Sequence, residues 1–165
     1  MQEITGQELI SEITLSDIEA SVGSDITFCA CVHKLRKMSG FTFVILRTGR
    51  YIFQSVYSPD TCESNIDDLT VGTYVKITGS IKEEKRAVYG YEITLKSLDI
   101  LSSPAAEYPL KVSDRELGCS LETNLKYRSV ALRHPHVRAV FKVSEGVVSG
   151  FREFMLSQNF TEIHT

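Results

Sequence analysis

The chain has 165 residues, a hydrophobic fraction of 42%, a charged fraction of 24% and a formal net charge of −3. These values are close to the averages of soluble globular proteins, so they exclude a chain disordered over most of its length and a wholly basic nucleic-acid binder. No apolar run approaches the roughly 18 residues that a membrane helix needs, and the first residues show no secretory signal. Four cysteines in a chain of this size favour a reduced, cytoplasmic setting over a disulfide framework.

The charge is spread unevenly along the sequence. Residues 1–24 carry five acids and no Lys or Arg, whereas residues 25–60 carry five bases and two acids. Aromatic residues interleave with these bases, and such a surface suits single-stranded nucleic acid, because phosphates attract cations and unstacked bases need flat apolar faces. The alternative interpretation is an ordinary solvated face of a barrel.

The first predicted elements follow from a change in the spacing of apolar residues. Residues 1–24 are expected to form a helical or loose extension that ends at Gly23. From residue 26 the period changes to two, and strands are predicted over 26–33, 41–47 and 51–56, with tight turns between them. These three strands form an antiparallel meander.

Two further strands complete the predicted sheet. After a polar connection, strands are predicted over 74–81 and 91–98. Gly79 lies inside the first of them, where a glycine often marks a bend or bulge at which a small barrel closes. A meander of three strands, a connection and two more strands are typical of a partly open Greek-key barrel of the oligonucleotide-binding type, the OB-fold. We expect this β-rich domain to occupy residues 25–103.

Beyond the barrel the sequence changes character. Residues 104–135 begin with a Pro- and Ala-containing stretch that indicates a hinge. Residues 137–158 carry apolar side chains at spacings of three and four, which predicts an amphipathic helix, and residues 160–165 alternate as a strand would. One striped helix and one strand cannot build a core, so residues 136–165 are expected to begin a second, α+β domain or to need a partner.

Several familiar catalytic and metal-binding patterns are excluded. Cys29 and Cys31 are too closely spaced for a zinc knuckle, and no second pair follows. His134 and His136 flank a proline at the approach to the predicted helix and lack the further ligands of a metal site. No P-loop, GxGxxG, GxSxG or HExxH string occurs. The sequence therefore predicts no catalytic residue and no metal site in this chain.

A binding site is predicted instead on the outer wall of the barrel. Phe43 offers a platform for a base, Gln54 an amide with a donor and an acceptor, and Arg36 a guanidinium for phosphate or a base oxygen. Glu92, on the fifth strand, adds an acceptor for the amino or imino edge of another base. The alternatives are a core position for Phe43 and ordinary surface positions for the other three residues.

The strings that carry these residues resemble the anticodon-binding barrel of aspartyl-tRNA synthetases of the archaeal and eukaryotic cytoplasmic kind. They are VHKLR at 32–36, FVILR at 43–47 and QSV at 54–56. The later stretch LETNLKYRSVALR at 121–133 looks like the family's LDTRLDxRxxDLR segment. Residues 138–141, 151–154 and 160–165 resemble motif 1 of the class II synthetases. The resemblance covers essentially everything after the N-terminal extension.

The resemblance implies a role for each residue of the predicted site. Arg36, Phe43 and Gln54 would recognise the central anticodon uridine, with Phe43 stacked on the base and the other two bonded to its edge. Glu92 matches the acidic position that helps to read a neighbouring anticodon base. The implied partner is tRNA(Asp), and no membrane is expected to take part.

The resemblance also implies a dimer and a reaction. Phe151, Phe154 and Phe160 of motif 1 would lie in a homodimer interface. The catalytic domain of this family activates aspartate with ATP and Mg²⁺ and transfers the aspartyl group to tRNA. Motifs 2 and 3, which carry the ATP-binding arginines, are absent from the 165 residues. These residues alone are therefore expected to bind tRNA without aminoacylating it.

The segment 121–133 departs from the family pattern at three positions. Asn124 stands where the family usually has Arg, Lys126 where Asp is common, and Ala131 where the acid of DLR lies. The connection between Arg36 and Phe43 is also one residue short. Asparaginyl- and lysyl-tRNA synthetases are therefore alternatives within the same group. The alternative of a different class is a stand-alone tRNA- or single-strand-binding module without ligase activity.

Overall fold

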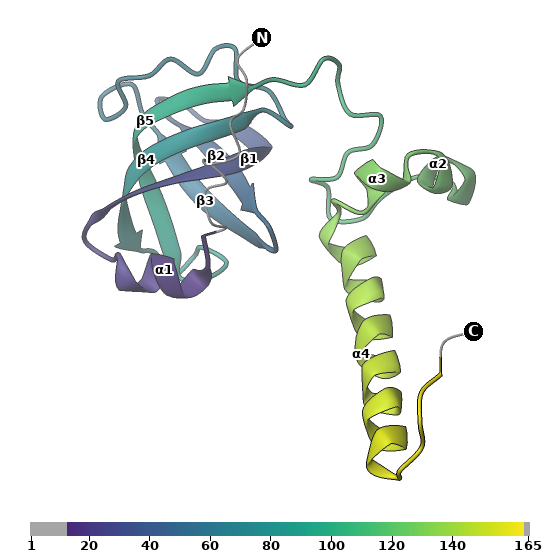
Figure 1. The fold of residues 1–165 in the computed structure, drawn as a ribbon. Coiled ribbons are helices and arrows are strands. Elements are labelled where there is room, and N and C mark those ends of the chain that lie inside the picture. The colour runs from purple at the N-terminus through teal and green to yellow at the C-terminus, as the bar shows by residue number, and fades with distance from the viewer. Residues whose placement is uncertain (1–12, 164–165) are drawn as a thin grey trace. The chain divides into compact units, whose positions relative to one another are not determined.

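The computed structural model describes residues 13–163 (Figure 1). The chain divides into two compact units between Glu107 and Tyr108. The first unit is built mainly of strands and the second of helices. The division lies inside the segment predicted as a hinge, whose bounds at 104 and 135 stay a prediction.

Five strands form the barrel of the first unit. They are β1 (Asp25–Lys37), β2 (Thr42–Thr48), β3 (Tyr51–Tyr57), β4 (Tyr74–Glu83) and β5 (Tyr91–Ser102). Their order around the barrel is β1-β2-β3-β5-β4, and β1 pairs with both β2 and β4. The predicted OB-type barrel is confirmed with one difference. It is closed rather than partly open, because three parallel residue pairs join β3 to β5.

Alternation along the strands buries one face of each. Val44 and Leu46 of β2 are fully buried, whereas the residues on either side of them point outward or are only partly covered. Burial of such a side chain stabilises a fold by about 1.5–3 kcal/mol. The bulge predicted at Gly79 is confirmed, since the register of β4 against β5 shifts there. A Cβ at Gly79 would come within 2.5 Å of the carbonyl oxygen of Thr94, so the two strands approach too closely for a side chain.

A short helix, α1 (Leu15–Ala20), precedes the barrel. A capping box starts it, in which the Thr14 N–H and hydroxyl donate to the Asp17 carboxylate at 2.7 and 2.6 Å. These hydrogen bonds lower the pKa of Asp17 from its ordinary value of 3.8. Ile18 is fully buried and belongs to the barrel core. Residues 1–12 of the predicted extension lie outside the described residues.

The second unit contains three helices. They are α2 (Leu121–Lys126), α3 (Arg128–Ala131) and α4 (Pro135–Ser157). The predicted amphipathic helix is confirmed as α4. His134 is its N-cap, because the His134 Nδ1 accepts from the His136 N–H at 3.2 Å. The interpretation of these two histidines as a helix approach is therefore confirmed. None of the described helices has the length and apolar character to span a lipid bilayer.

The end of the second unit differs from the prediction. The strand expected over 160–165 is not formed at residues 160–163, and residues 164–165 lie outside the described part of the chain. A strand needs a neighbour to satisfy its backbone N–H and C=O groups, and no strand of the second unit is described. The segment instead returns along α4, where the Arg152 guanidinium lies 2.9 Å from the Glu162 carboxylate.

Candidate nucleic-acid interface

Two adjacent rows of side chains cross the outer face of the barrel and contain all four residues of the predicted site. Following the strand register, the first row contains Arg36, Phe43, Val56, Thr94 and Ser80. The second row contains Lys34, Ile45, Gln54, Glu92 and Lys82. Opposite residues of antiparallel strands have Cβ atoms about 4.5–5.5 Å apart. The parallel pairing of β3 with β5 joins the two halves of each row, so each row brings side chains from five strands together.

Phe43 lies on the outer face of β2 and not in the core. It is half-buried, whereas Thr42 and Val44 on either side of it are buried. The ring of Phe41 meets it edge to face, with centroids 5.1 Å apart. The guanidinium of Arg36 lies over the Phe43 ring, with Cζ 5.2 Å from the centroid. The alternative of a core position for Phe43 is therefore excluded.

Gln54 connects the guanidinium to the carboxylate. Arg36 Nη2 donates to Gln54 Oε1 at 3.5 Å, and Gln54 Nε2 donates to Glu92 Oε2 at 2.6 Å. Arg36, Phe43, Gln54 and Glu92 thus form one continuous set of contacts over four strands, which we call the outer-face cluster. It combines an aromatic ring, a cation, an amide and an anion.

Glu92 is more buried than its place on the outer face indicates. It is 5% exposed, and the Lys82 ammonium lies 2.8 Å from its Oε1. Reasoning from the sequence missed Lys82. The signal that would have found it is the hairpin register, which places Lys82 opposite Glu92. A buried carboxylate requires such a partner, because removing an unpaired charge from water is costly.

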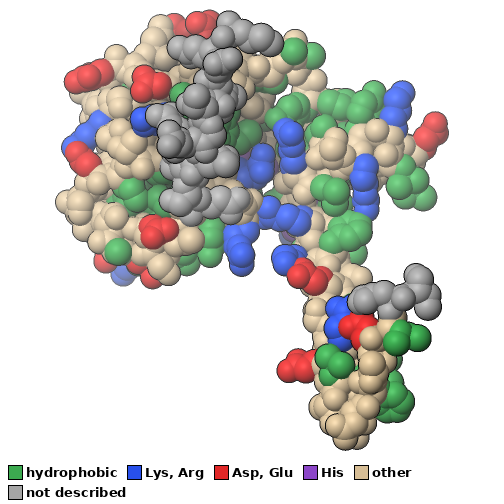
Figure 2. All heavy atoms as spheres, viewed as in Figure 1, with side chains coloured by type: hydrophobic (Ala, Val, Ile, Leu, Met, Phe, Trp, Pro, Cys, Tyr) green, Lys and Arg blue, Asp and Glu red, His purple; other side chains and the backbone are tan. Residues whose placement is uncertain are grey.

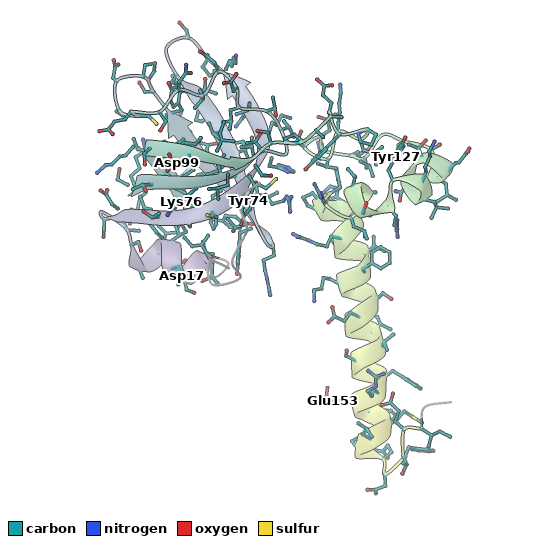
Figure 3. The ribbon with its side chains drawn as sticks, turned by 45° about the horizontal axis from the view of Figure 1, so that its top comes forward. Asp17, Tyr74, Lys76, Asp99, Tyr127 and Glu153 are labelled. Carbon is teal, nitrogen blue, oxygen red and sulfur yellow. The ribbon has the colours of Figure 1, made fainter. Side chains whose placement is uncertain are left out.

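The other ends of β4 and β5 carry a different surface. Figure 3 shows Tyr74, Lys76 and Asp99 on the outside of the barrel, where Lys76 lies opposite Asp99 in the strand register. Opposite charges in a cross-strand pair attract each other and reduce the local net charge. This surface is therefore less suited to a phosphate backbone than the one around Arg36.

The phenylalanines predicted for a dimer interface are exposed in this chain. Phe151, Phe154 and Phe160 are 65%, 60% and 59% exposed. Figure 2 shows hydrophobic side chains at the surface of the C-terminal part of α4 and of the segment that follows it. Phe151, Met155 and Phe160 help to line an apolar groove of about 370 Å³ between α4 and residues 160–162. Exposed apolar surface of this kind indicates an interaction site.

Two departures from the family pattern fit the local packing of the second unit. Arg128 Nη1 donates to Asn124 Oδ1 at 2.6 Å, and the same guanidinium lies over the ring of Phe141, 4.8 Å from its centroid. Ala131 is fully buried in a small cluster with Leu110. An aspartate at position 131 would bury a charge there and would need a partner.

Two family models match the chain. Residues 26–101 match the model described as OB-fold nucleic acid binding domain. Residues 120–165 match the model described as tRNA synthetases class II (D, K and N). The first match covers the barrel, and the second covers the three helices of the second unit.

The curated relatives are much longer than this chain. The aspartate–tRNA(Asp/Asn) ligase of Archaeoglobus fulgidus is 29% identical over 147 residues, which are 87% of this chain and 34% of that protein. The aspartate–tRNA(Asp/Asn) ligase of Sulfurisphaera tokodaii is 31% identical over 144 residues, which are 87% of this chain and 33% of that protein. The chain thus spans about a third of the length of the curated relatives that it matches.

Solved structures share the fold. The asparaginyl-tRNA synthetase of Pyrococcus horikoshii has a TM-score of 0.79 at 21% identity, covering 94% of this chain and 38% of that one. The aspartyl-tRNA synthetase of Entamoeba histolytica has a TM-score of 0.76 at 22% identity, covering 97% of this chain and 40% of that one. The predicted architecture, an OB-fold barrel followed by the first elements of a class II synthetase domain, is confirmed at the level of the fold.

Proposed function

We propose that the chain, which matches the OB-fold nucleic acid binding domain over residues 26–101 and the class II tRNA synthetases (D, K and N) over residues 120–165, is the anticodon-reading part of an aspartate–tRNA ligase. The observation that carries this proposal is the outer-face cluster, in which a ring, a guanidinium, an amide and a carboxylate from four strands touch one another. A base removed from its stack needs a flat face and hydrogen-bonding groups for its edge, and the cluster offers both.

Arg36 and an incoming base compete for the face of Phe43. The exposed contact between the guanidinium and the ring is worth about 0.5–1 kcal/mol, whereas a base stacked on an aromatic ring is worth about 1–3 kcal/mol. The exchange therefore favours the base. Arg36 is exposed and long, so it can move aside and donate to a phosphate or to the base edge. The barrel core does not change in this exchange.

We assign the Phe43 platform to the central anticodon uridine. The Gln54 amide carries an acceptor for the uracil N3–H and a donor for a uracil oxygen. Glu92 lies beside Gln54 on β5, and each carboxylate oxygen has a second lone pair beyond its bond to Gln54 or Lys82. These lone pairs suit the amino or imino edge of a neighbouring base.

The test of base reading is the substitution Gln54→Ala. Binding of an anticodon stem–loop RNA with a central uridine is expected to weaken by about 1–3 kcal/mol, which is about 5- to 150-fold in Kd. A titration with an unrelated stem–loop serves as the control and is expected to show a smaller loss. Equal losses for both RNAs would show that Gln54 does not read a base.

A second substitution, Phe43→Ala, tests whether Phe43 serves as a stacking platform for a base or as a packing residue of the barrel. The variant is expected to fold with nearly unchanged Tm and to lose RNA affinity, because Phe43 lies outside the core. Phe53→Ala is the matched control, since Phe53 is 2% exposed and its loss leaves a cavity in the barrel. A Tm loss for Phe43→Ala as large as that for Phe53→Ala would contradict the platform role.

We further propose that a second copy of the chain covers the apolar face of α4, as in a motif 1 homodimer. The exposure of Phe151, Phe154 and Phe160 supports this proposal. Sedimentation is expected to show a dimer that becomes a monomer in the double variant Phe151→Ser, Phe154→Ser. Val88→Ser is the control, since Val88 is an 83% exposed apolar residue of the barrel unit. A wild-type monomer at high concentration would overturn the dimer.

For the whole protein we propose cytoplasmic attachment of aspartate to tRNA(Asp) with ATP and Mg²⁺. The described residues contain no group of three or more His, Cys, Asp or Glu side chains able to hold a metal ion, so we assign none of them to Mg²⁺. An aminoacylation assay with aspartate and asparagine on tRNA(Asp) and tRNA(Asn) separates an aspartyl from an asparaginyl enzyme. Binding of tRNA by the whole protein without transfer of either amino acid would favour a binding module.

A further inference from the structure

We propose that Lys82 is a positioning residue which, through Glu92, fixes the orientation of the Gln54 amide and so makes the outer-face cluster select keto bases over amino bases. This inference rests on the proposed anticodon-reading function and concerns how the same site discriminates. Lys82 lies on β4, one strand beyond Glu92, and it belongs to none of the strings that resemble the synthetase family.

The orientation of the Gln54 amide is determined from both sides. A carboxylate can only accept hydrogen bonds, so the Gln54 group that faces Glu92 at 2.6 Å must be the NH₂. A guanidinium can only donate, so the group that faces Arg36 must be the carbonyl oxygen. The Arg36 bond is long at 3.5 Å and its side chain is exposed, so the bond to Glu92 is the stronger of the two restraints.

Lys82 holds the Glu92 carboxylate where it can accept the hydrogen bond from Gln54. The Glu92 side chain is only 7% exposed, and Lys82 Nζ and Gln54 Nε2 each lie at hydrogen-bond distance from a different oxygen of it. Arg86 is a nearby cation, but its Nε donates to Glu84 at 3.1 Å, and this contact lowers the pKa of the Glu84 carboxyl. Without Lys82 the buried carboxylate loses its ion-pair partner, and Gln54 loses a fixed acceptor.

The amide orientation decides which bases fit the platform. With the oxygen turned toward Arg36, the Gln54 amide can accept from a ring N–H and donate its second hydrogen to an adjacent base oxygen. Uracil and guanine present such an N–H beside an oxygen, whereas cytosine and adenine present a bare ring nitrogen beside an amino group. A flipped amide would match cytosine instead. The contacts of Lys82 and Glu92 therefore set a preference that Gln54 alone does not have.

The test compares two anticodon stem–loop RNAs that differ only in a central uridine or cytidine. Kd is measured by fluorescence anisotropy for the full chain and for Lys82→Met, Lys82→Arg and Lys85→Met. Lys85→Met is the matched control, because Lys85 is an exposed lysine three residues further along the chain, in the β4–β5 connection, and its loss changes the net charge equally. A thermal melt of each variant verifies that the barrel is folded.

In Lys82→Met the preference for uridine over cytidine is expected to fall by about fivefold or more, the lower end of the discrimination of one bidentate contact. Lys82→Arg is expected to keep the preference for uridine. Lys85→Met is expected to weaken the binding of both RNAs equally. An unchanged preference in Lys82→Met would overturn the role of Lys82 and leave the anticodon-reading function intact. Absence of any preference in the wild type would overturn both.

A measurement without RNA tests the positioning step by itself. The side-chain NH₂ of Gln54 gives a pair of amide NMR resonances, of which the proton bonded to Glu92 is expected at low field in the wild type and in Lys82→Arg. In Lys82→Met the two resonances are expected to move together and broaden as the amide samples both orientations. Unchanged resonances would contradict the role of Lys82, whatever the RNA titrations show.

Discussion

Helices α1 and α4 show opposite relations between length and burial. α1 has six residues, a capping box and a fully buried Ile18, whereas α4 has 23 residues and none of them is buried in this chain. Most helical stability in proteins comes from packing of an apolar face, since isolated helices are marginal in water. α1 packs against the core of the barrel, whereas the apolar side chains of α4 are not buried in this chain.

The two units differ in the same way. The described part of the barrel unit has a core cluster of sixteen buried residues, and that of the second unit has a cluster of three. A barrel with such a core keeps its strands in register, so the placement of its outer-face side chains does not depend on another surface. The second unit has few buried side chains to hold α4. The comparison predicts that one kind of substitution has opposite consequences in the two units.

The largest expected effect is that of Leu46→Ala in the barrel. Leu46 is fully buried, so the free energy of unfolding is expected to fall by about 2–5 kcal/mol. Phe154→Ala removes a larger side chain from α4, but Phe154 is 60% exposed, and the expected loss in a dilute sample is within about 0.5 kcal/mol. Urea unfolding at low protein concentration measures both. Similar losses of unfolding free energy in the two variants would contradict the expected difference between the two units.

The next effect concerns glycines, one in each unit. Gly79→Ala is expected to destabilise the barrel by about 1–3 kcal/mol, because the new Cβ would lie 2.5 Å from the Thr94 carbonyl oxygen and 2.8 Å from Ile93 Cγ2. Gly146→Ala in α4 meets nothing within 4 Å and is expected to stabilise the helix by about 0.5–1 kcal/mol. Circular dichroism during thermal unfolding follows both changes. A higher Tm for Gly79→Ala than for the wild type would mean that the strands separate easily at the bulge.

The smallest expected effect is the pH dependence of the α1 cap. The hydrogen bonds from Thr14 lower the folded-state pKa of Asp17 below 3.8, so their stabilisation is fully present above that value and is lost as the pH falls through the folded pKa. Asp17→Asn is therefore expected to lower Tm slightly at pH 7 and to have no such effect near about pH 2. Thr14→Ala is expected to reduce the same difference. A Tm loss that is equal at both pH values would contradict the cap.

Most of the helices and strands follow from local sequence patterns, but these patterns did not settle the strand face of every site residue. Alternation at a period of two is a property of the extended backbone, and it placed Glu92 on the face of its strand opposite Tyr91 and Ile93. A core position for Phe43 stayed open, and only the register shift between Val32 and Lys34 brings Arg36 to the outer face. The spacing of apolar residues in α4 and the glycine at the β4 bulge are equally local. The bounds differ by a few residues, as for β1, which continues to Lys37, because strand ends depend on pairing.

The tertiary structure alone decided which side chains meet. The bonds from Gln54 to Arg36 and Glu92 join residues 18 and 38 positions apart, and only the register and the closure of the barrel bring them together. The ion pair of Lys82 with Glu92 has the same origin, and it was missed because a lysine in a charged hairpin has no local sign of a buried partner. The strand predicted from Phe160 depends on a neighbouring strand, since alternation defines a face but cannot provide hydrogen-bonding partners.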